Sequence, residues 1–599
     1  MRHSYWILLF LGFLLFTPAK AKQKPNVIIV ITDDQGYGDI AAHGNQIIKT
    51  PHLDKLHSES IRLTNFHSGT TCAPSRSGLM TGVHGHRAGV WHTIAGCNIL
   101  REKYTAMPQV FKNNGYATAM FGKWHLGDAY PYLPENRGFE ETVCHGAGGI
   151  GQTPDFWDND YFDDTYMHNG NPQKYKGYCT DVYFAEALKY IEEKKDKPFF
   201  VYISTNAPHG PLNVPEKYYR MYENENKINA QQKAYYGMIT NIDDNVGMLE
   251  KKLVELGLTD NTILVFTTDN GTQYGYRNIK GQEFGYNAGM KGLKGSAYDG
   301  GHRVPFFIRW NQGGIKGGKD VESLVMNYDV LPTFVGLCNL RKKGVQDFDG
   351  RNIEAVLKDE TISLPQRYAV VDKNKTQQPV KWKMCSVMDE EWRLINGKEL
   401  YNINKDVGQI KDIAAQYPEK VKAMRDAYEK WWDYVSEDFS YFEAYKIGGG
   451  QSNEVVITVH DLHTASPVAW SQELIRNPLN GKKPALSEGY WMVDVQEEGE
   501  YEIALRRWPK ESVYSFNEEV PQLGMDKPWY FSRPKGLKLN INQASLHIGN
   551  VSEVSQVDMK KEEVKFKVHL NKGRSKLEAN FKTEDDNSFS AFYVYINKI

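Results

Sequence analysis

Carboxylate and amide side chains follow two apolar runs that are typical of buried strands. The runs are Asn26–Thr32 (NVIIVIT) and Thr262–Thr268 (TILVFTT), and the polar residues directly after them are Asp33, Asp34, Asp269 and Asn270. Ligands of open α/β sheets bind beyond the carboxyl ends of the strands. An all-oxygen set of ligands suits calcium or magnesium better than zinc. Either pair alone is explained as well by a turn, because Asp-Asn-Gly is a common turn sequence.

Lysine and histidine follow two further apolar runs. Ala117–Phe121 leads to Lys123 and His125, Phe199–Thr205 leads to His209, and Lys294 lies in the segment KGLKGSAYDGGHRVP at 291–305. A lone His beside a strand is usually structural, and a lone Lys is usually a solvated surface charge. If these side chains converge on one rim with the carboxylates and a metal, the expected ligand is a tetrahedral oxyanion.

The segment Cys72–Gly82 reads CAPSRSGLMTG and carries the most specific signal in the chain. It resembles the signature of type I sulfatases, C-x-P-S-R-x-x-x-(L/M)-T-G. Six near-fixed letters at about one in twenty each predict roughly 10⁻⁵ chance matches in a chain of this length. A proline-capped helix start with a buried Cys is physically sound but does not explain the neighbouring motifs. An ordinary thiol nucleophile is less well supported, because no Cys-His-Asn pattern is evident.

The other polar segments are similar to sulfatase motifs and occur in the family order. They are DDQG at 33–36, GKWHLG at 122–127, PHGP at 208–211, TTDNG at 267–271 and KGxxYDGGHRVP at 294–305. The resemblance covers about residues 24–435 and is closest to arylsulfatase-B-like members that act on sulfated sugars. Asp299 stands where the family usually has Glu, and we interpret this as a structural position.

The resemblance implies a modified nucleophile at position 72. A formylglycine-generating or sulfatase-maturating enzyme would convert Cys72 to 3-oxoalanine (formylglycine), and the aldehyde would hydrate. One diol oxygen then attacks sulfur and displaces the alcohol, and loss of the proton from the second hydroxyl releases sulfate. A plain Ser or Cys could not eliminate sulfate in this way.

The resemblance also implies a role for each candidate residue. One Ca²⁺ per site is expected at Asp33, Asp34, Cys72, Asp269 and Asn270, where it polarises sulfate oxygens and lowers the pKa of the diol. Arg76 would hold the formylglycine, and Lys123 and Lys294 would bind sulfate oxygens. His125 would be the base for elimination, and His209, with Lys294, the acid for the leaving alcohol. No cofactor beyond the metal is expected.

The elements that must position these residues alternate along the chain. Apolar runs, with a further one at Val304–Trp310, alternate with helix-like stretches such as Thr180–Glu193 and Gln231–Leu256. This alternation predicts an α/β class with a mixed, mainly parallel central sheet. The resemblance implies the alkaline-phosphatase-like sandwich fold.

The pattern of apolar runs and turn residues changes along the chain, and we use these changes to predict three parts. They are a catalytic α/β domain at 24–340, a small α+β subdomain at 341–436 and an accessory β-sandwich domain at 445–599. The helix expected in the subdomain is Pro418–Tyr434, and Gly448–Gly450 is a candidate linker. Short alternating runs separated by turn residues predict the C-terminal sandwich. They include Val455–His460, Tyr490–Val495 and Tyr501–Arg506.

Length and composition place the protein in a broad class. A chain of 599 residues favours two or three domains, and a formal net charge of -2 argues against a protein that coats nucleic acid or an anionic membrane. A basic start, a short apolar run and Ala19-Lys20-Ala21 predict a signal peptide at 1–21, so we expect a periplasmic or secreted protein with no membrane span. Six cysteines are too few to imply a disulfide framework.

Three other interpretations stay open. A phosphonate monoester or phosphodiester hydrolase could use the same scaffold, or the chain could be mainly a binding protein. The C-terminal domain could hold glycan through exposed aromatics such as Trp470, Trp508 or Trp529, or it could only brace the catalytic domain. Val90–Thr93 and Gly146–Asp164 are expected to wall a pocket for a sulfated saccharide.

Overall fold

The computed structural model describes residues 24–359, 361–449, 454–479, 484–524 and 526–599. The predicted signal peptide at 1–21 and Gly450 of the predicted linker lie outside these residues. No helix in the described ranges is long and apolar enough to cross a membrane. All six cysteines are free and buried.

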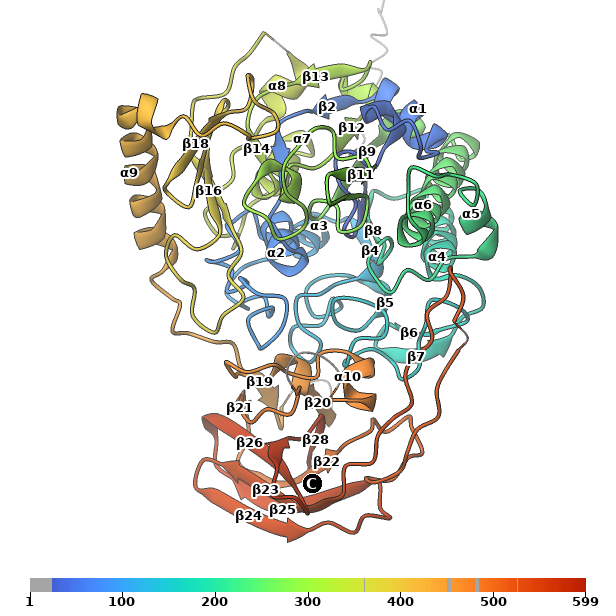
Figure 1. The fold of residues 1–599 in the computed structure, drawn as a ribbon, viewed down its shortest axis with the longest axis vertical. Helices are drawn as coiled ribbons and strands as arrows, with labels where there is room; N and C mark the ends of the chain where they lie inside the picture. The colour runs from blue at the N-terminus through green and yellow to red at the C-terminus, as the bar shows by residue number, and fades with distance from the viewer. Residues whose placement is uncertain (1–23, 360, 450–453, 480–483, 525) are drawn as a thin grey trace, which may run out of the picture.

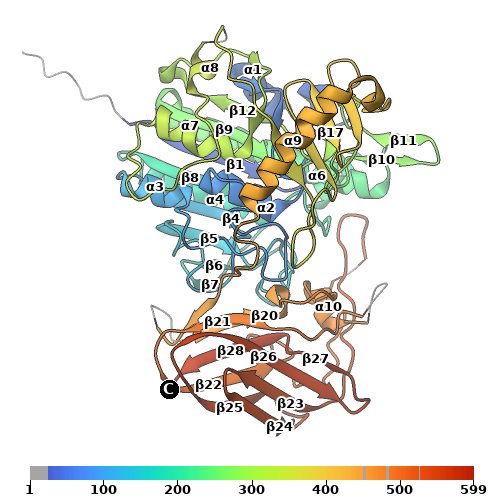
Figure 2. The ribbon, with the colours of Figure 1, turned by 90° about the vertical axis from the view of Figure 1, so that its left-hand side faces the viewer.

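A mixed sheet organises the N-terminal part of the structure (Figures 1 and 2). Within the described residues it has ten strands in the order β13-β2-β12-β9-β1-β8-β4-β5-β6-β7. The five middle strands are parallel, and β12 and β6 pair with them in antiparallel fashion. The strands are β1 Asn26–Thr32, β2 Ile61–Leu63, β4 Ala117–Lys123, β5 Glu141–His145, β6 Thr165–His168, β7 Asn171–Lys174, β8 Phe199–Ser204, β9 Thr262–Thr268, β12 Phe306–Arg309 and β13 Lys319–Val321. The predicted mixed, mainly parallel sheet is confirmed.

Helices cover both faces of this sheet, and β1 shows why its sequence is continuously apolar. Val27, Ile29 and Ile31 belong to the hydrophobic core on one face, and Ile28 and Val30 belong to the core on the other. A strand between two helical layers must be apolar on both sides. Residues of α2 Cys72–Thr81, α3 Met107–Asn113 and α7 Val330–Leu337 pack in the first core, and those of α1 Pro51–Glu59, α4 Cys179–Glu193, α5 Glu216–Arg220 and α6 Ala230–Glu255 pack in the second.

A smaller antiparallel sheet follows in the chain. Its four strands are β15 Ala369–Asp372, β16 Cys385–Met388, β17 Trp392–Ile395 and β18 Glu399–Asn402. The helix α9 Pro418–Val435 packs its buried residues Val421, Met424 and Tyr428 on this sheet. The predicted helix at 418–434 therefore agrees with the structure to within one residue.

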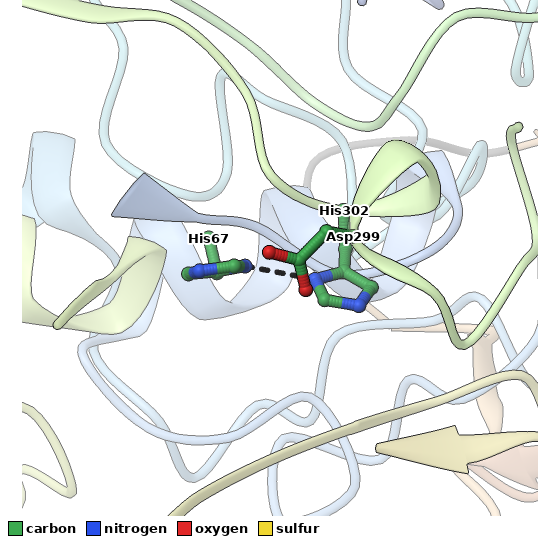
Figure 3. A group of neighbouring side chains, drawn as sticks. All are labelled: His67, Asp299 and His302. Carbon is green, nitrogen blue, oxygen red and sulfur yellow. Dashed lines mark hydrogen bonds between the residues drawn. The ribbon is translucent and has the colours of Figure 1, made fainter. Parts of the chain in front are cut away.

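A buried ion pair joins this small sheet to the large one. The Nε of Arg393 donates to the Oδ1 of Asp299 at 2.8 Å, and both side chains are almost fully buried. Asp299 also lies next to His302 and His67, whose Nδ1 atoms are 2.8 Å apart (Figure 3). The second nitrogen of each ring contacts an oxygen, of Asn65 for His67 and of Ala297 for His302. Except for the Oδ2 of Asp299, which has no hydrogen-bond partner among the described residues, these groups are paired beside a guanidinium, so the cluster serves as a structural link.

Removing the guanidinium should destabilise this link strongly. We expect Arg393→Met to lower the free energy of unfolding by about 3–5 kcal/mol, because it leaves the Asp299 carboxylate buried without its principal partner. The matched control is Lys422→Met, which breaks the exposed Lys422–Asp426 pair and should leave the free energy of unfolding nearly unchanged. Denaturant unfolding of both variants measures the difference. Equal effects in the two variants would contradict this account.

The C-terminal part consists of two facing sheets below the large sheet (Figure 2). In the described residues, one has six strands, with β27 Ser588–Ser590 beside β26 and the others in the order β19-β21-β26-β23-β24. The second has four strands in the order β20-β28-β22-β25. The remaining strands are β19 Tyr445–Ile447, β20 Glu454–Thr458, β21 Trp491–Val495, β22 Gly499–Arg506, β23 Ile541–Ile548, β24 Val551–Gln556, β25 Glu563–Leu570, β26 Gly573–Thr583 and β28 Tyr593–Lys598. Apart from β19, all pairings are antiparallel.

One hydrophobic core fills the space between these sheets and continues into the N-terminal part. It includes Trp491 and Trp508 from the C-terminal part together with Tyr132 and Trp157 from the large-sheet part. The β19 strand begins before the predicted linker, since Tyr445 already pairs with Val493 of β21. The C-terminal sheets are thus packed on the rest of the molecule.

Of the three tryptophans expected to be exposed, one is buried and one is half-buried. Trp508 is 1% exposed, and its ring contacts Trp157 in the shared core, so the expectation of an exposed glycan-binding ring was wrong there. Trp529 is half-buried, and its ring lies against Tyr219 of α5. Its backbone carbonyl accepts from the Val214 amide at 3.0 Å. In Figure 1 the long segment that carries Trp529 extends from the C-terminal sheets along the large-sheet part toward α5. Trp470 is 41% exposed.

Candidate active site

The strand order brings the predicted polar residues to one edge of the sheet. The strands β9, β1, β8 and β4 are consecutive and parallel, so their carboxyl ends are side by side. Asp269, Asp33, His209 and Lys123 follow or end these strands in that spatial order. The bend after β4 depends on Gly122, where φ is +108° and an added Cβ would meet the Ser204 carbonyl oxygen at 1.9 Å. Residues distant in sequence therefore converge because of the topology.

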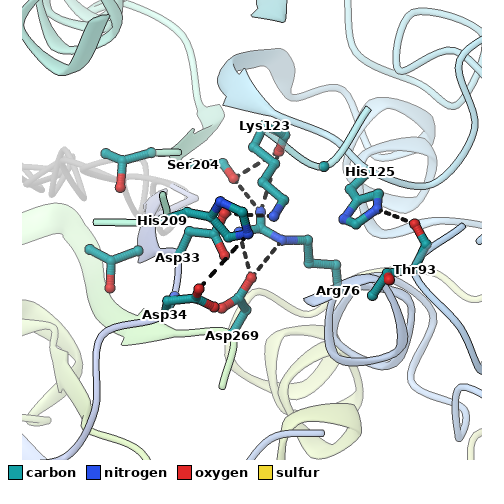
Figure 4. A network of polar contacts seen from close by, with 12 residues as sticks. Asp33, Asp34, Arg76, Thr93, Lys123, His125, Ser204, His209 and Asp269 are labelled. Atoms are coloured by element: carbon teal, nitrogen blue, oxygen red, sulfur yellow. Dashed lines mark hydrogen bonds and ion pairs between the residues drawn. The ribbon is translucent and has the colours of Figure 1, made fainter. Parts of the chain in front are cut away.

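The carboxylates of Asp33, Asp34 and Asp269 lie together at the centre of the site (Figure 4), and the amide of Asn270 joins them. Ligand atoms of Asp33, Cys72 and Asp269 all lie within 4.8 Å of one another, as do those of Asp33, Asp34 and His209. The Asn270 Nδ2 donates to the Oδ1 of Asp34 at 2.9 Å. All four oxygen-bearing residues are buried.

This donor set fits a divalent cation. The Oδ1 of Asp33 and the Oδ1 of Asn270 are buried without a hydrogen-bond partner among the described residues. Burial, and then the neighbouring Asp269, raise the pKa of Asp33 well above its usual value, although Lys123 opposes them. Buried carboxylates this close together need added positive charge to stay ionised. Oxygen ligands of this kind suit calcium or magnesium.

Cys72 and Arg76 come from the first two turns of α2. Cys72 begins the helix and is 3% exposed, and Arg76 lies one turn further on the same face. The Nε and Nη2 of Arg76 donate to the Oδ2 of Asp269 at 3.0 and 2.8 Å, and its Nη1 donates to the Ser204 Oγ at 2.5 Å. A fully buried guanidinium therefore fixes the helix start against the carboxylate cluster.

Lys123 and His125 reach the site from the end of β4. The Lys123 Nζ is 2.6 Å from the Oδ2 of Asp33, and both side chains are fully buried. The His125 Nε2 is 2.8 Å from the Thr93 carbonyl oxygen, to which it must donate, and its Nδ1 has no partner among the described residues. Burial, and then Lys123, lower the pKa of His125 well below its usual value. His125 is therefore neutral, with the lone pair of Nδ1 available. The backbone is left-handed there, with φ at 61°.

His209 and Lys294 approach Asp34. The Lys294 Nζ is 2.6 Å from the Oδ1 of Asp34, and the His209 Nε2 is 3.8 Å from its Oδ2. The His209 Nδ1 donates to the Gly210 carbonyl at 2.7 Å. Burial would lower the pKa of Lys294, but Asp34 outweighs it and the pKa is raised. Burial and Lys294 lower the pKa of His209 to about 4. Lys294 is thus the group that carries a proton at neutral pH.

A cavity of about 820 Å³ opens onto Cys72 and reaches beyond the predicted residues. His125, His209 and Lys294 line it, as do His92, Thr93 and Gln152 from the two segments expected to wall the pocket. The structure thus brings the predicted site residues to one place. Sequence reasoning missed the further lining residues Lys375, Thr376, Gln377 and 464–468, and it placed Trp470 on a separate glycan-binding surface.

Residues 25–340 match the family model described as Sulfatase. The chain belongs to the sulfatase family. It is a type I sulfatase and therefore a hydrolase of sulfuric esters. It is 30% identical over 372 residues to arylsulfatase G of Mus musculus, a match that covers 56% of this chain and 69% of that protein. It is 28% identical over 361 residues to N-acetylgalactosamine-6-sulfatase of Homo sapiens, which covers 56% and 66%.

The fold of this sulfatase also matches solved structures. The crystal structure of Ps i-CgsB in complex with k-i-k-neocarrahexaose has a TM-score of 0.61 and 27% sequence identity, and the match covers 70% of this chain and 95% of that one. This sulfatase also has two C-terminal β-sheets, and residues between β20 and β21 line its cavity.

Proposed function

We propose that this sulfatase removes sulfate from a sulfated saccharide, with formylglycine at position 72 and one calcium ion at Asp33, Asp34, Asp269 and Asn270. The observation that carries the proposal is the distance of at most 4.8 Å among the ligand atoms of Cys72, Asp33 and Asp269. A nucleophile precursor and a cation site share one small volume, and Lys123, Lys294, His125 and His209 surround it. The saccharide is supported by the named substrates of the related sulfatases.

Formylglycine at position 72 would supply an aldehyde hydrate that attacks sulfur and afterwards permits elimination of sulfate. Calcium would supply a Lewis acid that polarises the sulfate oxygens. Arg76 orients the side chain at position 72, since its guanidinium is fixed by Asp269 and Ser204. Conversion of Cys72 would require a formylglycine-generating or sulfatase-maturating enzyme, and the signal at 1–21 would direct export to the periplasm or beyond.

Side chains of this protein bind the sulfate and transfer the protons. Lys123 and Lys294 bind sulfate oxygens as point charges. His125 accepts a proton at Nδ1, because its Nε2–H already donates to Thr93 and its low pKa keeps the ring neutral. Lys294 and His209 face the leaving oxygen, and the raised pKa of Lys294 keeps its ammonium group protonated, so that it can donate a hydrogen bond to that oxygen. We also propose the division into 24–340, 341–436 and 445–599 as domains, with the last as an accessory β-sandwich.

Paired assays on matched sulfate and phosphate monoesters test this function. We expect sulfate to be hydrolysed with the higher kcat/KM, because one cation with two lysines and two neutral histidines offers limited positive charge for a phosphate dianion. We expect activity to fall after calcium is chelated and to return when calcium is added. A preference for phosphate or phosphonate esters would instead favour the phosphoryl-transfer alternative.

A further inference from the structure

Part of the cavity wall comes from the C-terminal part of the chain, from residues between β20 and β21. The cavity that opens onto Cys72 is lined on one side by 464–468, Trp470, Leu474 and Ala485, which are far from the catalytic motifs in sequence. This inference rests on the proposed function, because it concerns which substrates the same site accepts. These residues can shape the pocket only if contacts hold them in place beside the catalytic residues.

Hydrogen bonds fix the segment that carries Trp470 to the large-sheet part. The Thr153 amide donates to the Trp470 carbonyl at 3.0 Å, and the Trp470 amide donates to the Val468 carbonyl at 2.9 Å. Gln152 and Ser471 form an isolated β-bridge. The Gln472 side chain is buried and donates to the carbonyls of Asp155 and Phe156 at 3.0 and 3.1 Å. Because these contacts hold the backbone at Trp470 and the two residues after it, the Trp470 ring has a defined position at the cavity.

Trp470 is more exposed than the other tryptophans named in the C-terminal part. It is 41% exposed, whereas the C-terminal tryptophans Trp491 and Trp508 are buried in the core. Side chains of His92, Gln152 and Gln377 supply polar groups around the same cavity. An apolar platform with a few convergent polar groups is the usual construction of a small-molecule site. A sugar ring offers both an apolar C–H face for the indole and hydroxyls for the polar groups.

Lys375 supplies the cavity with a further positive charge. Lys294 is paired with Asp34, but Lys375 forms no ion pair with any residue in the described ranges. The loop that carries it is fixed, since the Trp91 Nε1 donates to the Thr376 carbonyl at 3.0 Å and the Gln377 Nε2 donates to the Ala95 carbonyl at 3.1 Å. No Asp or Glu is among the described residues that line the cavity. An unpaired cation in such surroundings is suited to an anionic ligand group.

We propose that residues 464–474, which follow β20 in the C-terminal part, complete the substrate pocket, with Trp470 packing on the ring of the sulfated sugar and Lys375 pairing with a second anionic group of the substrate. That group is a sulfate or a carboxylate on the same or the adjoining sugar. This C-terminal segment thereby determines which substrates the catalytic site accepts.

The role of Trp470 is tested with two substrates of different size. The readout is the ratio of kcat/KM for a defined sulfated saccharide to kcat/KM for 4-nitrophenyl sulfate. We expect Trp470→Ala to lower this ratio about tenfold, mainly through KM, and Trp470→Phe to lower it less, because a ring is retained. Phe531→Ala is the matched control, since Phe531 is a C-terminal aromatic that is 40% exposed and lies outside the cavity, and the ratio should stay unchanged.

The role of Lys375 is tested with saccharides that differ in their second anionic group. We expect Lys375→Gln to lower kcat/KM about tenfold for a disulfated or a uronate-bearing saccharide, and to have little effect on a monosulfated neutral one. The saccharide for which kcat/KM falls more, disulfated or uronate-bearing, identifies whether the second anionic group is a sulfate or a carboxylate. Lys405→Gln, on an exposed residue outside the cavity, is the control.

Three results decide the matter. The inference is overturned if Trp470→Ala leaves the substrate ratio unchanged, or if Lys375→Gln weakens all saccharides equally, while the wild-type protein hydrolyses sulfate esters. If the wild-type protein, with position 72 converted and calcium supplied, hydrolyses no sulfate ester, then the proposed function itself fails and the inference fails with it.

Discussion

Replacement of Cys72 by alanine is expected to abolish sulfate ester hydrolysis, with a loss on the order of 10⁵–10⁶ in kcat. The reason is that the other side chains of the site bind, orient or move protons, and none of them can form the bond to sulfur. Cys72 is 3% exposed at the start of α2 and lines the cavity, so the alanine variant should fold normally. Hydrolysis of 4-nitrophenyl sulfate and of a sulfated saccharide measures the loss.

The serine variant separates the two halves of the reaction. Cys72→Ser keeps a hydroxyl at the same position but cannot carry a second hydroxyl on the same carbon. A sulfate transferred to it would have no route of elimination, so we expect at most one alcohol released per protein chain. Burst kinetics with enzyme at substrate-like concentration and intact-protein mass spectrometry detect this trapped state. Sustained turnover by Cys72→Ser, or normal activity of Cys72→Ala, would contradict the role of position 72.

Loss of the Asp269 carboxylate should have the largest combined effect on activity and stability. Asp269 accepts two hydrogen bonds from Arg76, and both side chains are fully buried. Its Oδ1 also accepts from the Asp34 amide at 3.2 Å. Asp269→Ala leaves the guanidinium buried without its carboxylate, which we expect to cost about 3–5 kcal/mol in the free energy of unfolding. It also removes a ligand from the proposed cation site and should abolish turnover.

Thermal unfolding with and without calcium isolates the cation's share of this effect. For the wild-type protein, calcium at about 100 times its Kd should add about 2.7 kcal/mol of stability, because it binds only the folded state. Asp269→Ala should gain little from calcium. Asp426→Ala removes the carboxylate of an exposed pair and should respond to calcium like the wild-type protein. An Asp269→Ala variant that is stable, and stabilised by calcium as much as the wild-type protein, would show that the cation lies elsewhere.

The sequence allowed good prediction of the elements that position the site, because their burial is complete. The bounds of β1 and β9 were predicted to the residue, since both are continuous apolar runs that end at charged or polar residues. Parallel strands between two helical layers have no polar face, so their limits are visible in the sequence. The relative positions of Asp33, Lys123 and Asp269 then follow from the carboxyl ends of neighbouring strands.

The C-terminal sheets were harder to predict in detail. The strands β23 and β26 were missed, because one face of each is polar and they include sequences such as Asn542-Gln543 and Lys576 to Lys582. Whether a tryptophan in this part of the chain is buried or exposed depends on tertiary packing. Trp508 follows two arginines and Trp470 follows Val468-Ala469, yet Trp508 is buried against Trp157 and Trp470 lines the cavity. Only the three-dimensional arrangement of the sheets distinguishes them.

The missed residues of the pocket share a physical cause. Lys375 and Trp470 reach the cavity through loops whose positions depend on contacts with distant segments, such as Thr376 with Trp91 and Trp470 with Thr153. No local pattern encodes a contact between segments separated by hundreds of residues. Their residue types were visible in the sequence, but their neighbours were not.

The central claim is that an aldehyde replaces the thiol at position 72 in the active protein. Peptide mass spectrometry of enzyme purified in active form tests it most directly. We expect the peptide that contains Cys72–Gly82 to be lighter than its unmodified form by the exchange of sulfur for oxygen and the loss of two hydrogens, and we expect activity to rise in proportion to the converted fraction. Full activity in protein whose position 72 is entirely unmodified cysteine would contradict the account.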